Sequence, residues 1–392
     1  MLLPYATLAQ KTRDTSFFRI TEINIIGNFK TEDRIVLIAA DLTINQRIPK
    51  KDMKLQFETA ENNVQNTDLF NTVDISNFPI NDTLTELIIT VSERWFFWPI
   101  PIVENADPNF NTWWQRKDFS RLNYGLVLMY NNLGGKAQGI GGLIQLGYSK
   151  RFALLYNIPY ASSNGKLGVS FYGGYDQQHE VTIGTNNNKR VFYTGLSGNT
   201  KEHWQLQFSL LHRHKIVTTN TISAAFKNVS IVPPVSALKQ DYLGDSLPNI
   251  RYLELSYLFK KDKRNYKHYP LTGYYLDLLI QQHGLGINNN LFLTTFEGSA
   301  SKFLKVHNRV YGAIGFKGKF TPQNNIPYFL QQGLGYDNNL RGYEYYVVDG
   351  NHFGMFKSNI KLELIEKKNS LLKKIKNQKF NTFYYALYLN FF

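Results

Sequence analysis

The sequence contains no cysteine in 392 residues. This excludes a disulfide framework, a thiolate metal site and a cysteine nucleophile. It also contains no run of 18 consecutive apolar residues, so we expect no transmembrane helix. A mean hydropathy of −0.32 excludes a helical membrane protein. It does not exclude a membrane β-barrel, in which only every second residue of a strand faces lipid.

Aromatic residues and positive charge are abundant. Aromatics make up 15% of the chain, with 25 Tyr and 28 Phe, and they favour strands and membrane–water boundaries. The formal net charge of +14 admits anionic lipid or nucleic acid as partners. Lys and Arg are spread along the chain, however, and the densest run, 367–379, is interpreted as a solvated turn. Nucleic acid is therefore not predicted as a partner.

The first sixteen residues are interpreted as a leader. Thr7 and Ala9 fit the small residues that precede signal-peptide cleavage, here before Gln10. The apolar stretch is short and no basic segment precedes it. We therefore expect the true start of the protein to lie upstream.

Residues 17–94 predict a small α+β domain. A strand ends at Gly27-Asn28, and Thr31 is predicted as the N-cap of a first helix. Helical spacing of apolar residues predicts a second helix over 51–66, and two strands follow. The order is strand, helix, helix, strand, strand. Glu93, at the end of the last strand, is expected to cap or pair locally.

Residues 93–101 are interpreted as a linker between two domains. Pro99 and Pro101 exclude a helix and disfavour a central strand. The aromatic cluster Trp95-Phe96-Phe97-Trp98 suits a chain that enters a membrane interface. An apolar patch between two soluble domains is the alternative.

From about residue 98 onward the apolar period is two. Segments of about ten residues are longer than the usual strands of a soluble sandwich, and their alternation is typical of a transmembrane β-barrel. We predict about thirteen strands, with short turns at 133–135 and 148–150 and long loops at 176–190, 218–248 and 321–352. The clearest alternating segments are 122–130, 140–148, 152–158, 167–175, 204–210, 253–259, 274–280, 308–320, 353–365 and 383–391.

Two resemblances follow from short motifs. The N-terminal unit resembles a POTRA domain through Ile25-Ile26-Gly27-Asn28, Leu69-Phe70 and Val91-Ser92-Glu93. As a whole, residues 18–392 resemble the BamA/TamA superfamily (bacterial surface antigen type), in which POTRA units precede a sixteen-stranded barrel. The barrel motifs are Asn131-Asn132-Leu133-Gly134-Gly135, then Asp262, Arg264, Pro270 and Gly273, and finally Leu340-Arg341-Gly342-Tyr343.

The last of these motifs is the most specific. In the family its arginine reaches into the barrel lumen and pairs with an aspartate on a later strand, which suits the bidentate geometry of a guanidinium. The resemblance assigns that role to Arg341. A solvated loop arginine is the alternative.

The chain departs from the family pattern after this loop. Only two strands follow where the family has more, so about thirteen of sixteen strands are expected and the aspartate-bearing segment is missing. The resemblance therefore implies a C-terminally truncated member. We divide the chain into a leader (1–16), a POTRA-like domain (17–94) and an incomplete outer-membrane β-barrel (95–392).

The resemblance implies a non-enzymatic factor for outer-membrane protein insertion or translocation. Unfolded outer-membrane protein clients, the lipid bilayer and periplasmic or lipoprotein accessory subunits are its implied partners. The domain would lie in the periplasm, and no cofactor is implied. The alternatives are a pore, a two-partner secretion transporter or a non-functional fragment. A hydrolase using His212, His214 and Ser209 lacks a triad pattern, and the histidines lack a third metal ligand.

Overall fold

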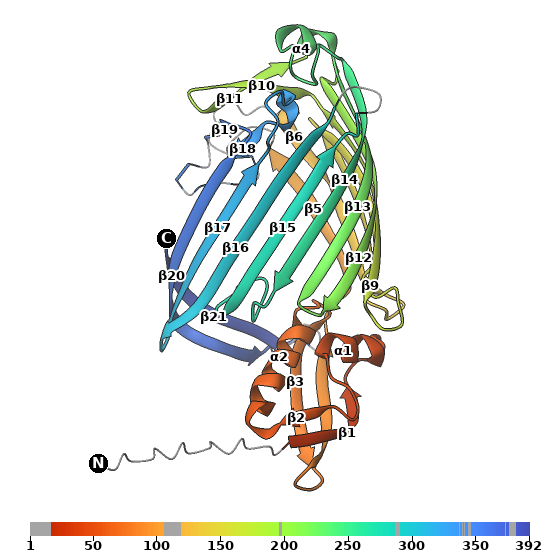
Figure 1. Ribbon diagram of the computed structural model, residues 1–392, viewed down its shortest axis with the longest axis vertical. Coiled ribbons are helices and arrows are strands. Elements are labelled where there is room, and N and C mark those ends of the chain that lie inside the picture. The colour runs from red at the N-terminus through yellow and green to blue at the C-terminus, as the bar shows by residue number, and fades with distance from the viewer. Residues whose placement is uncertain are drawn as a thin grey trace, which may run out of the picture.

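The computed structural model describes residues 17–105, 119–195, 198–286, 291–336, 338, 340, 342–343, 346–372, 374–375 and 382–392. A small α+β domain is followed by a large antiparallel sheet that curves into a barrel (Figure 1). The domain lies at one end of the barrel, which we call the proximal end. The opposite end is called distal.

The N-terminal domain is a four-stranded sheet with two α-helices. Its sheet has the order β2-β1-β4-β3, with β1 parallel to β4. Apolar residues of both helices, such as Ile35 and Val64, pack with Leu87 of the central strand β4 in one buried core. The predicted order of elements is confirmed, with the short β2 as an addition. The elements are β1 (Phe17–Ile26), α1 (Asp33–Ala40), β2 (Arg47–Pro49), the 3₁₀ helix η1 (Lys50–Asp52), α2 (Met53–Gln65), β3 (Phe70–Pro79) and β4 (Leu84–Glu93).

Over the described residues, the barrel is one sheet of thirteen strands, in the order β21-β20-β17-β16-β15-β14-β13-β12-β9-β8-β7-β6-β5. The predicted fold class and the count of about thirteen strands are confirmed. The strands are β5 (Phe97–Asn105), β6 (Leu122–Leu133), β7 (Gln138–Gly147), β8 (Lys150–Ile158), β9 (Leu167–Gln178), β12 (Lys201–Lys215), β13 (Thr218–Ile231), β14 (Asn249–Asp262), β15 (Gly273–His283), β16 (Leu293–His307), β17 (Val310–Phe320), β20 (Phe353–Leu371) and β21 (Thr382–Phe391).

The barrel is apolar outside and polar inside, the reverse of a water-soluble protein. Along β12, Leu206, Phe208 and Leu210 are exposed on the outer face. The inner face holds ion pairs such as Lys227–Glu254 at 2.7 Å and Arg151–Asp176 at 3.4 Å. The apolar residues of the alternating segments therefore face outward and the polar residues face the lumen, as the sequence predicts. The helices that the structure describes are all too short or too polar to cross a bilayer.

The distal end is covered by packed loop structure. Hairpin β10 (Glu180–Asn186) and β11 (Lys189–Thr194), helix α4 (Pro233–Leu238), 3₁₀ helix η3 (Tyr328–Leu330) and strands β18 (Gln332–Leu334) and β19 (Val348–Asp349) gather there (Figure 1). A second buried core contains Val235, Tyr242, Ile250 and Tyr328. A 3₁₀ helix, η2 (Phe119–Arg121), precedes β6.

Three loop predictions need correction. The stretch 176–190 contains β10, which forms a separate hairpin with β11, and 218–248 contains all of β13, which pairs with β12 and β14 in the barrel sheet. The predicted linker 93–101 overlaps β5, which starts at Phe97. Among the strands that the structure describes, β5 pairs with β6 alone, and such an edge strand tolerates proline because one side of its backbone needs no donor.

The two faces of β15 predict a test of the barrel's orientation in lipid. Leu278 faces outward, whereas its neighbour Leu279 faces inward opposite Glu297. We expect Leu278→Arg to lower the free energy of unfolding from lipid vesicles by about 2–4 kcal/mol. Leu279→Arg adds the same side chain beside a carboxylate and should cost much less. Urea titration of tryptophan fluorescence measures both, and equal losses would contradict the assignment of faces.

Candidate functional site

A buried polar relay joins the N-terminal domain to the barrel. The Glu93 carboxylate accepts hydrogen bonds from the backbone N–H of Lys30 (2.9 Å) and Thr31 (2.6 Å) and from the Thr31 hydroxyl (2.7 Å). The Thr31 oxygen in turn accepts from the amide Nδ2 of Asn132, at the end of β6, at 2.8 Å. All three side chains are buried. Glu93 was expected to cap or pair locally, whereas its carboxylate bonds to Lys30 and Thr31, which are distant in sequence, and supports the domain–barrel junction.

Thr31 does not cap helix α1 as predicted. The N-cap position is Glu32, which makes no side-chain capping bond. The Thr31 hydroxyl instead donates to the Glu93 carboxylate and accepts from the Asn132 amide, so its oxygen does not accept from a backbone N–H of the helix. Tertiary contacts therefore decide its role.

Gly27 and Asn28 shape the loop that carries Thr31. A Cβ on Gly27 would lie 2.0 Å from the Val91 carbonyl oxygen, and its φ is +94°. Asn28 donates to the Thr31 carbonyl at 2.8 Å and to the Asp33 carboxylate at 2.5 Å. The three predicted POTRA-motif residues thus form one structural unit with Thr31.

The turn after β6 contacts this loop directly. The N–H of Glu32 donates to the Gly135 carbonyl at 2.9 Å. A Cβ on Gly135 would lie 2.1 Å from the Lys30 carbonyl oxygen, whereas a Cβ on Gly134 meets nothing within 4 Å. The sequence predicts the Asn131–Gly135 motif only as a turn. In the structure, Gly135 also allows the backbones of domain and barrel to approach closely.

The second barrel motif shapes the turn between β14 and β15. Arg264 donates to both oxygens of Asp262, at 2.8 and 2.6 Å. Gly273 has φ +104°, and a Cβ there would lie 2.0 Å from the Lys263 carbonyl oxygen. The Pro270 carbonyl accepts from Lys361 of β20 at 2.9 Å. The structure therefore brings Asp262, Arg264, Pro270 and Gly273 together at one turn.

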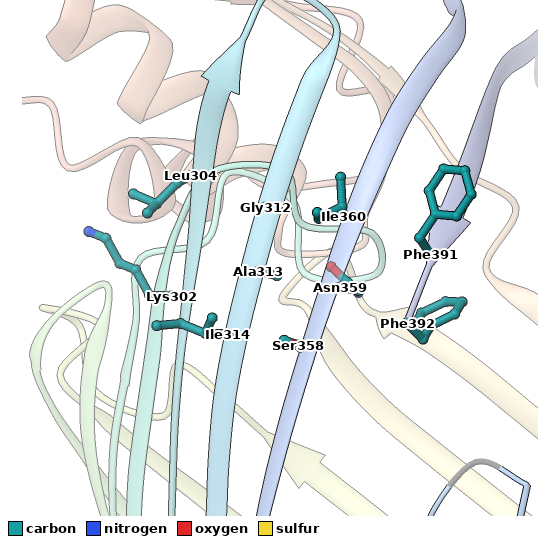
Figure 2. Close-up of a pocket in the computed structure, with 10 residues that line it drawn as sticks. All are labelled: Lys302, Leu304, Gly312, Ala313, Ile314, Ser358, Asn359, Ile360, Phe391 and Phe392. Carbon is teal, nitrogen blue, oxygen red and sulfur yellow. The ribbon is translucent and has the colours of Figure 1, made fainter.

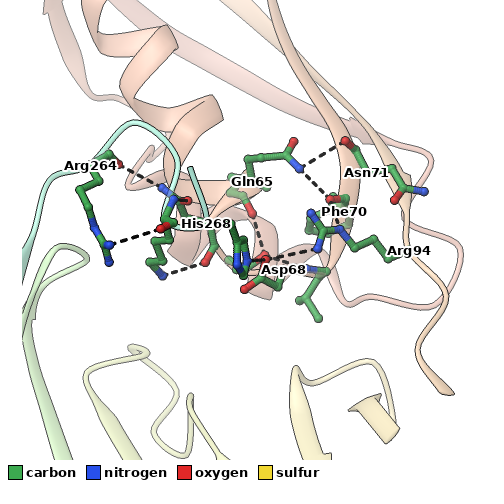
Figure 3. Close-up of polar contacts among 12 residues, drawn as sticks. Gln65, Asp68, Phe70, Asn71, Arg94, Arg264 and His268 are labelled. Carbon is green, nitrogen blue, oxygen red and sulfur yellow. Dashed lines mark hydrogen bonds and ion pairs between the residues drawn. The ribbon is translucent and has the colours of Figure 1, made fainter. Parts of the chain in front are cut away.

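This turn is the second contact with the N-terminal domain (Figure 3). The Asp68 carboxylate lies 2.8 Å from His268 Nε2 and 3.3 Å from Arg94 Nη1. Asn66 accepts from the Lys267 N–H at 3.0 Å, and its carbonyl accepts from the Lys267 amine at 2.8 Å. Burial lowers the pKa of this amine. The sequence offered no signal for these contacts.

A third turn completes the attachment. The Arg34 guanidinium of α1 donates to the carbonyls of Ser162 and Ser163, each at 3.0 Å, and of Tyr160 at 3.2 Å. Three proximal turns that are far apart in sequence therefore hold one small domain. Such an arrangement fixes the domain's orientation relative to the barrel.

The Leu340–Tyr343 loop emerges at the distal end. Its base is fixed by Asp349, which accepts from Tyr328 (3.0 Å), Thr185 (3.1 Å) and Tyr336. Burial, together with Asp349, raises the pKa of Tyr336 to about 12. Within the loop, Leu340 is half-buried, Gly342 has φ +78° and Tyr343 is 62% exposed. Arg341 lies outside the described residues, as does the predicted leader.

The two edges of the sheet differ in hydrogen-bonding capacity. The N–H of Asn131 donates to the Phe96 carbonyl at 2.8 Å, and the β5–β6 register continues from this pair. Even-numbered residues of β5 therefore point their backbone groups toward β6, and odd-numbered residues point toward the free edge. Pro99 and Pro101 are odd, so this edge lacks two consecutive N–H donors.

The opposite edge, β21, contains no proline and keeps its donors. The Glu363 N–H donates to the Arg309 carbonyl. Odd-numbered residues of β20 therefore point their backbone groups toward β17 there, and even-numbered residues point theirs toward β21. Tyr388 and Asn390 consequently present their backbone groups to the free side. In the described part of the chain, β5 and β21 do not pair with each other. We call the two free edges the seam.

The structure also locates the residues of the hydrolase hypothesis. His212 and His214 lie on the outer face of β12 near its proximal end, whereas Ser209 faces the lumen. These side chains do not meet. The described residues contain no cluster of His, Asp and Glu suited to a metal ion.

Comparison with known proteins supports the fold. No protein-family model matches the sequence, and no curated protein matches it. CdiB from Escherichia coli is similar in structure, with a TM-score of 0.55 and 14% identity over 89% of this chain and 62% of that chain. BamA from Haemophilus ducreyi lacking POTRA domains 1–3 gives a TM-score of 0.48 and 13% identity, over 89% of this chain and 68% of that chain. The chain thus spans less than two thirds of CdiB, and the likeness to CdiB concerns the fold of such barrels.

The two adjacent glycines predict a matched test of the junction. Both Gly134 and Gly135 have positive φ, so alanine strains the backbone at either position. Only Gly135→Ala also collides with Lys30. In this variant we expect the amide hydrogens of α1 to exchange at least about tenfold faster, consistent with the loss of one or two buried hydrogen bonds. Gly134→Ala should leave the exchange nearly unchanged. Equal exchange in both variants would refute the close-approach role.

Proposed function

We propose that the chain is a non-enzymatic outer-membrane protein of the BamA/TamA type that assists insertion or translocation of unfolded outer-membrane proteins. The observation that carries this proposal is the junction: an α+β domain is attached at three turns to the proximal end of a barrel whose sheet has two free edges. A domain fixed in this way can deliver an extended segment to the seam.

The N-terminal domain is proposed to be a periplasmic POTRA unit. Its strand–helix–helix–strand–strand order and the Gly27, Asn28 and Glu93 unit support this reading. β3 is an edge of its sheet, and an edge strand binds extended peptides by β-augmentation. Accessory subunits would bind the same domain from the periplasm.

The seam is proposed to receive client strands, chiefly along β21. A strand added to β21 finds backbone donors and acceptors in alternation. A strand added to β5 finds no donor at residues 99 and 101, and it loses two hydrogen bonds where lipid offers no water to replace them. Proline is also a common device against unwanted pairing at a sheet edge.

This asymmetry predicts a crosslinking result. Because the chain has no native cysteine, Leu389→Cys reports on β21 and Ile100→Cys reports on β5. We expect a single-cysteine client to crosslink at least about threefold more at 389 than at 100. Adding Pro99→Val and Pro101→Val to the Ile100→Cys variant should raise its yield. Equal yields before the proline substitutions would argue against the assignment.

Client folding tests the function itself. Vesicles containing the refolded chain should speed the appearance of a heat-modifiable form of an added, urea-unfolded barrel protein several-fold over empty vesicles. Gly135→Ala should reduce this acceleration, because the domain loses its fixed orientation, whereas Gly134→Ala should not. No acceleration by the folded protein would overturn the proposal.

The second candidate is a pore or two-partner secretion transporter. The structural likeness to CdiB favours it, since the same barrel serves both roles. The packed distal core, with Tyr242 and Tyr328, would then act as a closure that has to move. Ion conductance in planar bilayers without any effect on client folding would favour this candidate.

A further inference from the structure

Three lysines surround one tyrosine ring on the outer face of the barrel. The amines of Lys261, Lys263 and Lys302 lie 5.6, 5.9 and 5.5 Å from the centroid of the Tyr274 ring. The sheet register causes this grouping. Tyr274 is opposite Lys302 on β16, and the Lys263 N–H donates to the Tyr274 carbonyl at 2.8 Å. The cluster lies toward the proximal end, near the β14–β15 turn.

No carboxylate of these strands balances the cluster. Among the described residues, the positions of β14, β15 and β16 that share the outer face with Tyr274 include no Asp or Glu. Their acidic residues Glu254, Asp262, Asp277 and Glu297 alternate onto the lumen face. The three lysines also form no ion pair within the described residues. Each amine lies within 6 Å of the same ring, so the three charges together would stabilise an anion that approaches this part of the outer face.

An apolar groove of about 430 Å³ shares Lys302 with the cluster, and Figure 2 shows the residues that line it. Lys302, Leu304, Ile314 and Ile360 line it, and it extends toward Phe391. The groove exists because Gly312 occupies an outward position between Leu304 and Ile360 without a side chain. Its lining is mostly apolar, as a bound hydrocarbon chain requires.

We propose that this site binds an anionic membrane phospholipid, with its phosphate among Lys261, Lys263 and Lys302 and an acyl chain in the groove at Gly312. The lysines share the face of the lipid-exposed apolar residues, so their anion comes from the bilayer. Basic residues near a membrane surface attract anionic lipids, and a tyrosine suits the headgroup level. The inference rests on the proposed membrane location and is independent of the client role.

Lipid retention tests the site. The refolded chain is placed in nanodiscs with equal phosphatidylglycerol and phosphatidylcholine, extracted in mild detergent, and its bound lipids are counted by mass spectrometry. We expect phosphatidylglycerol to be enriched. The variant K261Q/K263Q/K302Q should lower the enrichment on the order of tenfold. Gly312→Val keeps the lysines but fills the groove, and it should also lower retention.

A matched variant removes the same charge from the other face. Lys260, Lys305 and Lys317 point into the lumen, and K260Q/K305Q/K317Q should retain the enrichment. Equal loss in both triple variants would overturn the proposal. So would binding of inorganic phosphate by the detergent-solubilised chain without phosphatidylglycerol enrichment, which would identify a site for free anions. Heat-modifiable mobility confirms folding of each variant, and failure to enter nanodiscs would instead count against the membrane location.

Discussion

In lipid, backbone N–H and C=O groups have no water to bond, and this constraint governs the barrel. Thirteen strands in one open order pair their backbones at twelve contacts and leave two edges, β5 and β21. Since successive strands alternate in direction, the first and last of thirteen run the same way. Direct closure between them would therefore need a parallel pair. One additional strand between them would restore antiparallel pairing on both sides.

The unequal edges give this constraint a functional meaning. Two prolines on the free side of β5 reduce the number of backbone hydrogen bonds that a neighbouring strand can form there. On β21 the donors remain, so a strand placed in the seam is held more firmly on one side than on the other. Such an imbalance would suit the proposed insertion role, because a client held equally strongly on both sides would be difficult to release.

The N-terminal domain is held to the barrel by a different kind of interaction. Its attachment uses buried hydrogen bonds through Thr31 and close backbone approach at Gly135, and Tyr130, Ala137 and Tyr160 also pack against the domain's apolar core. Buried polar relays of this kind are specific, because each lost partner leaves another group unsatisfied. The second and third contacts, at Asn66 and Arg34, prevent rotation about the first. The domain thus keeps a defined position at the proximal mouth.

The sequence by itself determined the element order of residues 17–93, a barrel of about thirteen strands and the apolar face of its alternating segments, although it placed β13 in a loop and β5 in a linker. These follow from local periodicity, which any single strand or helix carries. It also located Gly27, Glu93, Asp262, Arg264 and Gly273, but not what they contact. Only the tertiary structure decided that Thr31 bonds to Asn132, that the prolines face the free edge and that three lysines meet at Tyr274. These features depend on register and on turns far apart in the chain, and no local pattern encodes such distances.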